Sequence, residues 1–261
     1  MSPWVDPAQA SDAIRRGQGQ GVKIAILDSG IETSHPALAA MPLADDSAIV
    51  EEGRQLCTIP GGGLDVFGHG TAVAGIVHAG APLATIGSFR VLSGSLRSRT
   101  AIIMEGARAA IEGGYQIINC SLGSGVREHW DKFKSWVDEA YLRGVHIVAA
   151  CNNQDASRPE WPAHFTSVIA VNMARHAGPA DLFHRPGSLV EFAAHGVDVE
   201  VAWSGGTHRR MSGSSFAAPH VTAMLARLLS EIPDLTPLQA KLLLQKVAQP
   251  CGPKVRASND R

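Results

Sequence analysis

The sequence has no excess of charge of either sign and no long apolar run, and both absences restrict what the protein can do. Its 261 residues include 23 Lys and Arg against 24 Asp and Glu. The basic residues form no block of the kind that binding to a phosphate backbone requires. Near the C-terminus, Arg227 and Glu231 interrupt the longest apolar stretch, which is then too short to cross a bilayer. We therefore expect no nucleic-acid partner and no membrane span.

Cysteine and histidine lack the spacings that mark disulfide frameworks and metal centres. The four cysteines form no CxxC pair, and the eleven histidines form no HExxH pattern. We expect all four cysteines to be reduced and no metal in the catalytic chemistry. Residues 1–20 contain no basic segment leading into an apolar one, so they predict no signal peptide. Reduced cysteines and no signal peptide together predict a cytoplasmic protein.

Short apolar runs alternate with helical patterns over most of the chain. The runs are typical of strands buried on both faces and lie at 22–27, 85–92, 115–122, 145–151 and 167–171. The helical patterns between them occupy 69–79, 100–112 and 129–143. This alternation predicts an α/β fold of three layers, with a mostly parallel central sheet flanked by helices on both faces.

The remaining segments complete one expected domain over residues 1–261. Residues 1–20 form a lead-in with a short helix around Ala8 to Arg16, and 189–203 predict short strands that could pair antiparallel. A helix follows Ser215, with Pro219 expected in its first turn, where a missing N–H costs little. A last helix is expected from Thr236 to about Ala248, and residues 249–261 form a loose tail.

An aspartate, a histidine and a serine stand at the ends of three of these elements. Asp28 follows the first strand, His69 opens a helix, and Ser215 opens another. Taken singly, each is more often a cap or turn residue. Together they supply a nucleophile, a base and a carboxylate that fixes the tautomer of the base. Because polar groups at the carboxyl ends of parallel strands meet at one edge, we expect these elements to bring the three together.

The order Asp, His, Ser excludes an α/β-hydrolase, which runs serine, acid, histidine around GxSxG. The segments "ILDSGIETSHP", "GHGTAVAGIV" and "GSSFAAPHV" resemble the three motifs of the subtilisin-like serine proteases, the subtilase family. The resemblance covers about Val22 to Ala248 and implies a serine endopeptidase that forms an acyl-enzyme. Ser215 would attack the peptide carbonyl, His69 would take and return the proton, and Asp28 would orient the imidazole.

The resemblance also implies an oxyanion hole and a peptide-binding edge. Asn153, in "VAACNNQ", matches the oxyanion-hole asparagine of the family, whose side-chain amide donates to the developing charge. The family usually has glycine before it, whereas this chain has Asn152, so Asn152 or a shifted loop could take the role. Ser121, Leu122 and Gly123 match the stretch that pairs with an extended substrate.

Two further segments suggest substrate specificity. In "PEWPAHFTSVIAV", which aligns with the wall of the S1 pocket, Glu160 falls where many relatives have a small residue. A carboxylate there would favour Lys or Arg at P1; the alternative is a solvated loop glutamate beside Arg158. Arg97 and Arg99 lie where the S2–S4 wall is expected and would favour acidic residues upstream of the cut; the alternative is that both are solvated loop arginines.

Departures from the family pattern predict what this chain lacks. Relatives bind calcium through a loop in the histidine helix and an acidic residue after "SHP". Here 78–84 reads "HAGAPLA" and the acidic position is Ala37, so we expect no calcium at that site, although weaker calcium sites elsewhere stay open. The chain begins about twenty residues before the first strand, so no prodomain is expected. We therefore expect either a compact cytoplasmic enzyme or an excised domain of a larger polypeptide, and we favour the excised domain.

Three functions compete on the sequence alone. The first is a serine endopeptidase, dedicated in one version to processing a precursor or leader peptide, with a basic P1 residue. The second is a catalytically silent subtilase fold that binds peptides, against which the complete triad argues. The third is an acyl-transfer macrocyclase, which would need an inserted lid to exclude water from the acyl-enzyme.

Overall fold

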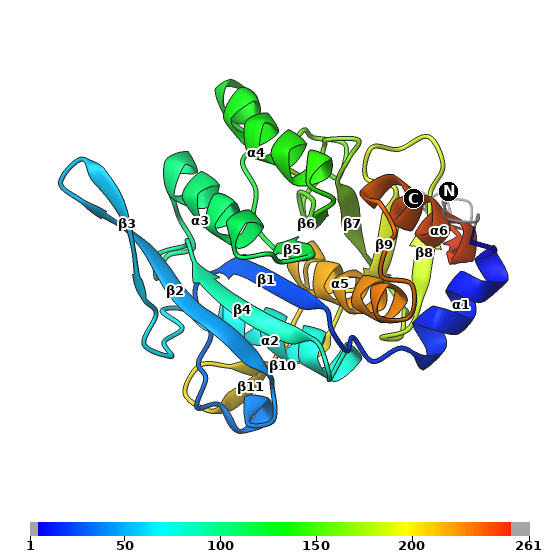
Figure 1. Cartoon of the computed structure of the whole chain (residues 1–261), viewed down its shortest axis with the longest axis horizontal. Helices are drawn as coiled ribbons and strands as arrows, with labels where there is room; N and C mark the ends of the chain where they lie inside the picture. Colours follow the sequence, from blue (N-terminus) through cyan, green and yellow to red (C-terminus); the bar gives the residue numbers. More distant parts are fainter. Residues whose placement is uncertain (1–4, 252–261) are drawn as a thin grey trace, which may run out of the picture.

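A ten-stranded sheet forms the centre of the molecule in the computed structural model, which describes residues 5–251 (Figure 1). Its strand order is β12-β8-β9-β7-β6-β5-β1-β4-β2-β3. The strands are β1 (Lys23–Asp28), β2 (Leu43–Glu52), β3 (Gln55–Pro60), β4 (Thr85–Arg90), β5 (Ile117–Cys120), β6 (His146–Ala150), β7 (Ile169–Ala174), β8 (Leu182–His184), β9 (Phe192–His195) and β12 (Gln249–Pro250).

Strand pairing in this sheet is mostly parallel, which confirms the predicted fold class. All neighbouring pairs from β9 through β7, β6, β5, β1 and β4 to β2 run parallel. The antiparallel pairs are β2 with β3 and β8 with β9. A separate antiparallel hairpin, β10 (Val199–Trp203) with β11 (Thr207–Met211), packs against the helix that carries His69.

Helices cover both faces of the sheet because its inner strands are apolar on both sides. In β1, Ile24 and Ile26 point into one core, and Ala25 and Leu27 point into the other, as the period of two requires. The first core includes α1 (Pro7–Arg16), α2 (His69–Gly80), α5 (Ser214–Glu231) and α6 (Pro237–Val247). The second includes α3 (Thr100–Glu112) and α4 (Trp130–Leu142). The three-layer prediction is therefore confirmed (Figure 1).

Two segments differ from the prediction. The hairpin of β2 and β3 was not expected, and it extends the sheet beyond β4 as a projecting arm (Figure 1). The tail was expected to be loose from residue 249, but Gln249 and Pro250 pair in parallel with Phe183 and His184 of β8. Residues 1–4 of the lead-in and 252–261 of the tail lie outside the described residues.

The topology places the site where the direction of winding reverses. From β1, the chain adds β4 and β2 on one side and β5, β6 and β7 on the other. The carboxyl ends of β1 and β5 therefore flank a crevice, the usual ligand-binding position in an open parallel sheet. Asp28 ends β1, and Ser121 directly follows β5.

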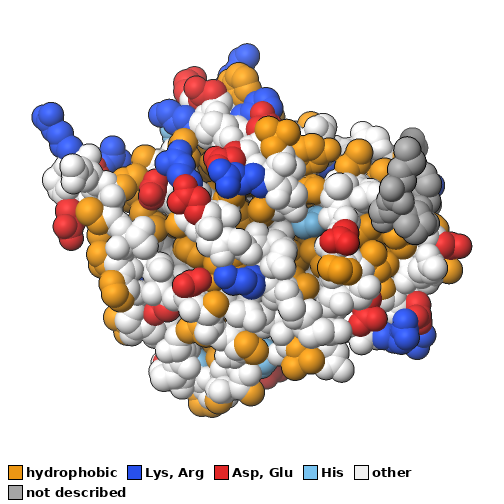
Figure 2. Space-filling view, viewed as in Figure 1, with side chains coloured by type: hydrophobic (Ala, Val, Ile, Leu, Met, Phe, Trp, Pro, Cys, Tyr) orange, Lys and Arg blue, Asp and Glu red, His pale blue; other side chains and the backbone are white. Residues whose placement is uncertain are grey.

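On the face shown in Figure 2, Lys and Arg side chains lie among Asp and Glu side chains over α3 and α4. Within residues 5–251, no helix has the length and apolar character needed to span a bilayer.

Candidate active site

Asp28 and His69 form a buried hydrogen-bonded pair. The imidazole Nδ1 lies 2.8 Å from Oδ1 and 2.9 Å from Oδ2 of Asp28. Burial alone would lower the pKa of His69, but the charge and hydrogen bond of Asp28, with the charge of Asp65, outweigh burial and raise that pKa. A carboxylate bonded to Nδ1 also fixes the tautomer, leaving Nε2 to accept a proton.

The start of α2 brings His69 onto Asp28 through close backbone contacts. Gly70 lies against the turn after β1, where an added Cβ atom would be 2.0 Å from the Gly30 carbonyl oxygen. A side chain at residue 70 would therefore separate the helix from the strand end. His69 is the first residue of α2, so the close contact between Gly70 and Gly30 also holds its imidazole in place.

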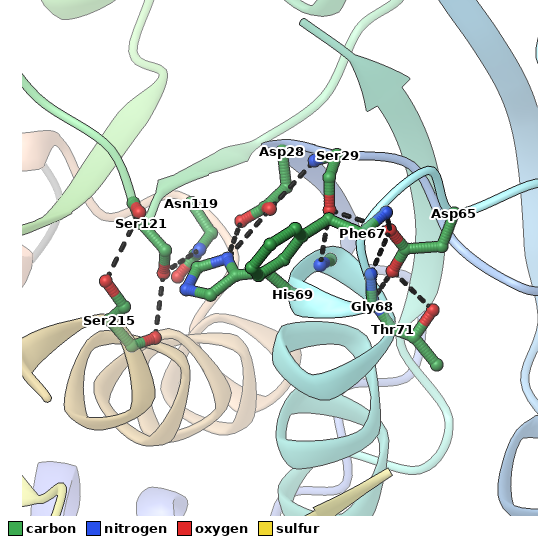
Figure 3. A network of polar contacts seen from close by, with 11 residues as sticks. Asp28, Ser29, Asp65, Phe67, Gly68, His69, Thr71, Asn119, Ser121 and Ser215 are labelled. Atoms are coloured by element: carbon green, nitrogen blue, oxygen red, sulfur yellow. Dashed lines mark hydrogen bonds and ion pairs between the residues drawn. The ribbon is translucent and has the colours of Figure 1, made fainter. Parts of the chain in front are cut away.

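Ser215 lines the same cleft as His69, but its side chain is not hydrogen-bonded to His69. It is the second residue of α5, and its hydroxyl donates to the Ser121 carbonyl oxygen at 3.3 Å (Figure 3). Within residues 5–251, no hydrogen bond joins Ser215 to His69. Both residues line a cleft of ≈ 410 Å³. The structure thus brings His69 and Ser215 to one cleft, with Asp28 bonded to His69 and the serine hydroxyl turned to Ser121.

Pro219 lies deeper in α5 than expected, and its position has a structural role. It was predicted in the first turn but is the sixth residue of the helix. Without an N–H, it cannot donate to the carbonyl oxygen of Ser215, four residues earlier. The Ser121 hydroxyl donates to that oxygen instead, at 2.9 Å. The end of β5 is therefore joined to the start of α5 at the nucleophile.

Of the two adjacent asparagines, Asn153 is the one beside the nucleophile. Its Oδ1 accepts a 2.7 Å hydrogen bond from the Ser214 backbone N–H, at the first turn of α5. Asn152 instead folds over its own loop, with Oδ1 accepting from the N–H groups of Gln154 and Asp155 at 2.9 and 3.0 Å. The geometry therefore favours Asn153 over Asn152 as the oxyanion donor.

The expected peptide-binding residues line the cleft, and Glu160 lies beside them. Ser121, Leu122 and Gly123 line this cleft, and Arg97 lines it as well. Glu160 packs over Gly123: a Cβ atom added at Gly123 would lie 2.7 Å from Cγ of Glu160. Burial raises the pKa of the Glu160 carboxyl, and within residues 5–251 no ion pair joins it to Arg158.

Arg97 and Arg99 differ in their availability to a ligand. Arg99 pairs with Glu51 of β2, so its charge is already neutralised near the turn that joins β2 to β3. Arg97 lines the cleft, and its guanidinium forms no ion pair with any residue between 5 and 251. Only Arg97 is therefore placed to meet an acidic substrate residue.

Asp65 is a residue of this site that sequence reasoning missed. Its carboxylate accepts hydrogen bonds from the turn after β1 and from the first turn of α2 (Figure 3). It stands four residues before His69 in "DVFGHG", outside the positions where a helix cap is usually sought.

Comparisons with known proteins agree with this geometry. The sequence profile described as the subtilase family matches residues 19–259. Subtilisin BL of Lederbergia lenta is 31% identical over 261 residues, covering 96% of this chain and 92% of that protein. Subtilisin DY of Bacillus licheniformis is 32% identical, covering 90% of this chain and 86% of its own. Subtilisin E of Bacillus subtilis is 29% identical, and the alignment spans 62% of its length.

Solved structures show the same similarity. A cold-adapted subtilisin-like serine proteinase superposes with a TM-score of 0.73 at 27% identity, covering 88% of this chain and 83% of that one. Sphericase superposes with a TM-score of 0.72 at 27% identity, with the same coverage of both chains.

Proposed function

Because the chain belongs to the subtilase family of serine endopeptidases, we propose that it hydrolyses peptide bonds with Ser215 as nucleophile, His69 as general base and Asp28 as the group that orients His69. The observation that carries this proposal is the bond of 2.8 Å between Asp28 and His69 Nδ1 at a cleft that Ser215 also lines. This arrangement leaves Nε2 free to take the serine proton.

The first step of the proposed reaction is a turn of the Ser215 hydroxyl. At present it donates to the Ser121 carbonyl oxygen, which is also an acceptor that an extended peptide backbone would use. A substrate N–H bonded to that oxygen would release the hydroxyl toward His69. Catalytic hydrogen bonds often tighten only when substrate is bound.

Attack and collapse then follow the usual course of acyl transfer. Ser215 Oγ bonds to the peptide carbonyl carbon while its proton passes to His69 Nε2, and Asp28 stabilises the imidazolium. The Asn153 amide and the Ser215 N–H donate to the developing oxyanion. His69 returns the proton to the leaving amine, and water hydrolyses the acyl-enzyme by the same steps in reverse.

For the substrate, we propose a dedicated precursor or leader peptide with Lys or Arg at P1. The half-buried Glu160 carboxylate beside Gly123 would meet a basic side chain, and Arg97 would meet an acidic residue further upstream. For the location, we propose the cytoplasm, with support from the four cysteines, all of which are free thiols.

A fluorophosphonate probe tests the proposed activity. We expect intact-mass analysis to show one adduct on the wild type and none on Ser215→Ala, followed by cleavage of a peptide library by the wild type alone. A well-folded wild type that takes no label would favour the silent peptide-binding fold. Labelling with transfer of the acyl group to an added amine, and no hydrolysis, would favour the macrocyclase.

A further inference from the structure

The first turn of α2 is capped by a residue that lies outside the helix. Its N-cap residue, Gly68, has φ 110 and no side chain, and an added Cβ atom would lie 2.7 Å from the Trp203 ring. The N-cap position therefore cannot carry the usual Ser, Thr, Asp or Asn. The N–H groups of the first turn still need acceptors.

Asp65 accepts from two of these groups, the N–H of Gly68 and the N–H of Thr71, and also from the N–H of Phe67 just before the N-cap. Its Oδ1 accepts from the N–H groups of Phe67 and Gly68 at 3.0 and 2.7 Å. Its Oδ2 accepts from the N–H and the hydroxyl of Thr71 at 2.7 and 2.6 Å. The carboxylate also lies near the positive end of the helix dipole, where a negative charge is stabilised.

The same carboxylate reaches the strand that carries the catalytic acid. Ser29 donates its hydroxyl to Asp65 Oδ1 at 2.7 Å and accepts from the Gly70 N–H at 3.1 Å. The Ser29 backbone N–H donates to Asp28 Oδ1 at 2.8 Å. Asp65 is thus connected on one side to the acid and on the other to the helix that begins with His69 (Figure 3).

We propose that Asp65 is a positioning residue for peptide hydrolysis: its carboxylate holds the first turn of α2 against the turn after β1, so that His69 Nδ1 stays on Asp28. This inference rests on the proposed roles of Asp28 and His69. The charged groups that act on His69 are Asp28 and Asp65, and the negative charge of Asp65 also favours the imidazolium that forms during the reaction.

Asp65→Asn tests this role, with Asp6→Asn as the matched control. Asp6 caps α1 through the Ala8 N–H in the same manner, and its described bonds are all with residues of the first turn of α1. In Asp65→Asn, an NH2 group replaces one acceptor and the charge is lost. We expect kcat to fall about 10- to 100-fold with KM changed by less than about twofold, since geometry is lost at the reacting groups. Asp6→Asn should keep the wild-type kcat.

The pH profile separates positioning from general destabilisation. We expect the acidic limb of kcat/KM, which reports the pKa of His69 in the free enzyme, to move to lower pH in Asp65→Asn. A loss of folded protein alone would lower the profile without moving it. An unchanged kcat, or an unmoved limb with a loss that matches the unfolded fraction, would overturn the proposal.

Two further measurements keep the test decisive. If Asp65→Asn fails to fold, Thr71→Val removes one donor to the carboxylate and Thr71→Ser keeps it, so we expect kcat to fall in the first and recover in the second. Equal kcat in both would count against the proposal.

NMR titration of His69 in the wild type and Asp65→Asn needs no turnover. If the wild type hydrolysed no peptide, the proposed function would fail, while the His69 titration would still decide the role of Asp65.

Discussion

The Ser121 hydroxyl donates a 2.9 Å hydrogen bond to the carbonyl oxygen of Ser215. The acceptor is available because Pro219, four residues further along α5, has no N–H to offer it. One residue of the peptide-binding edge is therefore tied to the backbone of the nucleophile. The bond depends on the proline as well as on the serine.

A double-mutant cycle should show this dependence. Ser121→Ala removes the side-chain hydrogen bond to the Ser215 carbonyl oxygen, and we expect the free energy of unfolding to fall by about 1–3 kcal/mol. In a Pro219→Ala background, the new N–H can reach that oxygen, so the same serine substitution should cost less. Denaturant unfolding of the four proteins gives the coupling, expected at about 0.5–2 kcal/mol. Additive effects would mean that Ser121 and Pro219 act independently.

The Asp28–His69 pair predicts a pH dependence with a definite sign. Because the pKa of His69 is raised from 6.5, the acidic limb of kcat/KM should have its midpoint above pH 6.5. Asp28→Asn should lower kcat about 10⁴-fold by favouring the wrong tautomer and should move the limb to lower pH. Because the pKa of His69 is raised in the folded protein, its protonated form stabilises the fold. This contribution is fully present below pH 6.5 and is lost as the pH rises through the folded-state pKa. An acidic limb that is the same in both proteins would contradict this assignment.

The adjacent asparagines provide their own control. Asn153→Ala should lower kcat about 10²- to 10³-fold with little change in KM, because the lost donor acts on the oxyanion and not on the ground state. Asn152→Ala removes only the acceptor of a local turn, so its kcat should stay within about threefold of the wild type by the same reasoning. Steady-state kinetics on one peptide substrate compare the two. The reverse order of effects would assign the oxyanion site to Asn152.

Calcium removal tests the expected loss of the family site. Residues 78–84 contain no carboxylate, and Ala37 has no side-chain oxygen, so this site lacks the side-chain oxygens that calcium sites use. We expect the same Tm and the same residual activity in EDTA as in millimolar calcium, measured by thermal unfolding and peptide hydrolysis. A Tm that rises with calcium would point to one of the other sites that the sequence leaves open.

Elements with local signals could be predicted from the sequence, and elements without them could not. The helix at Thr100–Glu112 matches its predicted bounds because a threonine opens it and Gly113-Gly114 closes it. The β2–β3 arm lies near the sheet edge and is largely exposed, so "LADDSAIVEE" contains no apolar run like those of the inner strands.

The site shows the same division. Its motif residues could be identified from the chain, whereas Asp65 could not, because it caps α2 from three residues before the N-cap. Its importance depends on Ser29, which is distant in sequence and adjacent only in the fold. The position of Pro219 was predicted wrongly because the start of α5 at Ser214 is set by contacts with the loops after β5 and β6.

The Glu160 carboxylate predicts which residue precedes the cut. Burial raises its pKa, which means that the ionised form lacks compensation in the free enzyme and would gain it from a cationic side chain. We expect kcat/KM for Lys or Arg at P1 to exceed that for Leu, and Glu160→Gln to lower the ratio about 10- to 100-fold, the effect of one charge-assisted hydrogen bond of about 1.5–3 kcal/mol. Arg158→Ala, which removes the neighbouring charge of the alternative interpretation, should leave the ratio unchanged. Competition between two matched peptides in one reaction measures the ratio directly. The Glu160 side chain lies against Gly123 of the peptide-binding edge. An equal preference in the wild type and Glu160→Gln would therefore mean that the P1 side chain binds away from this carboxylate.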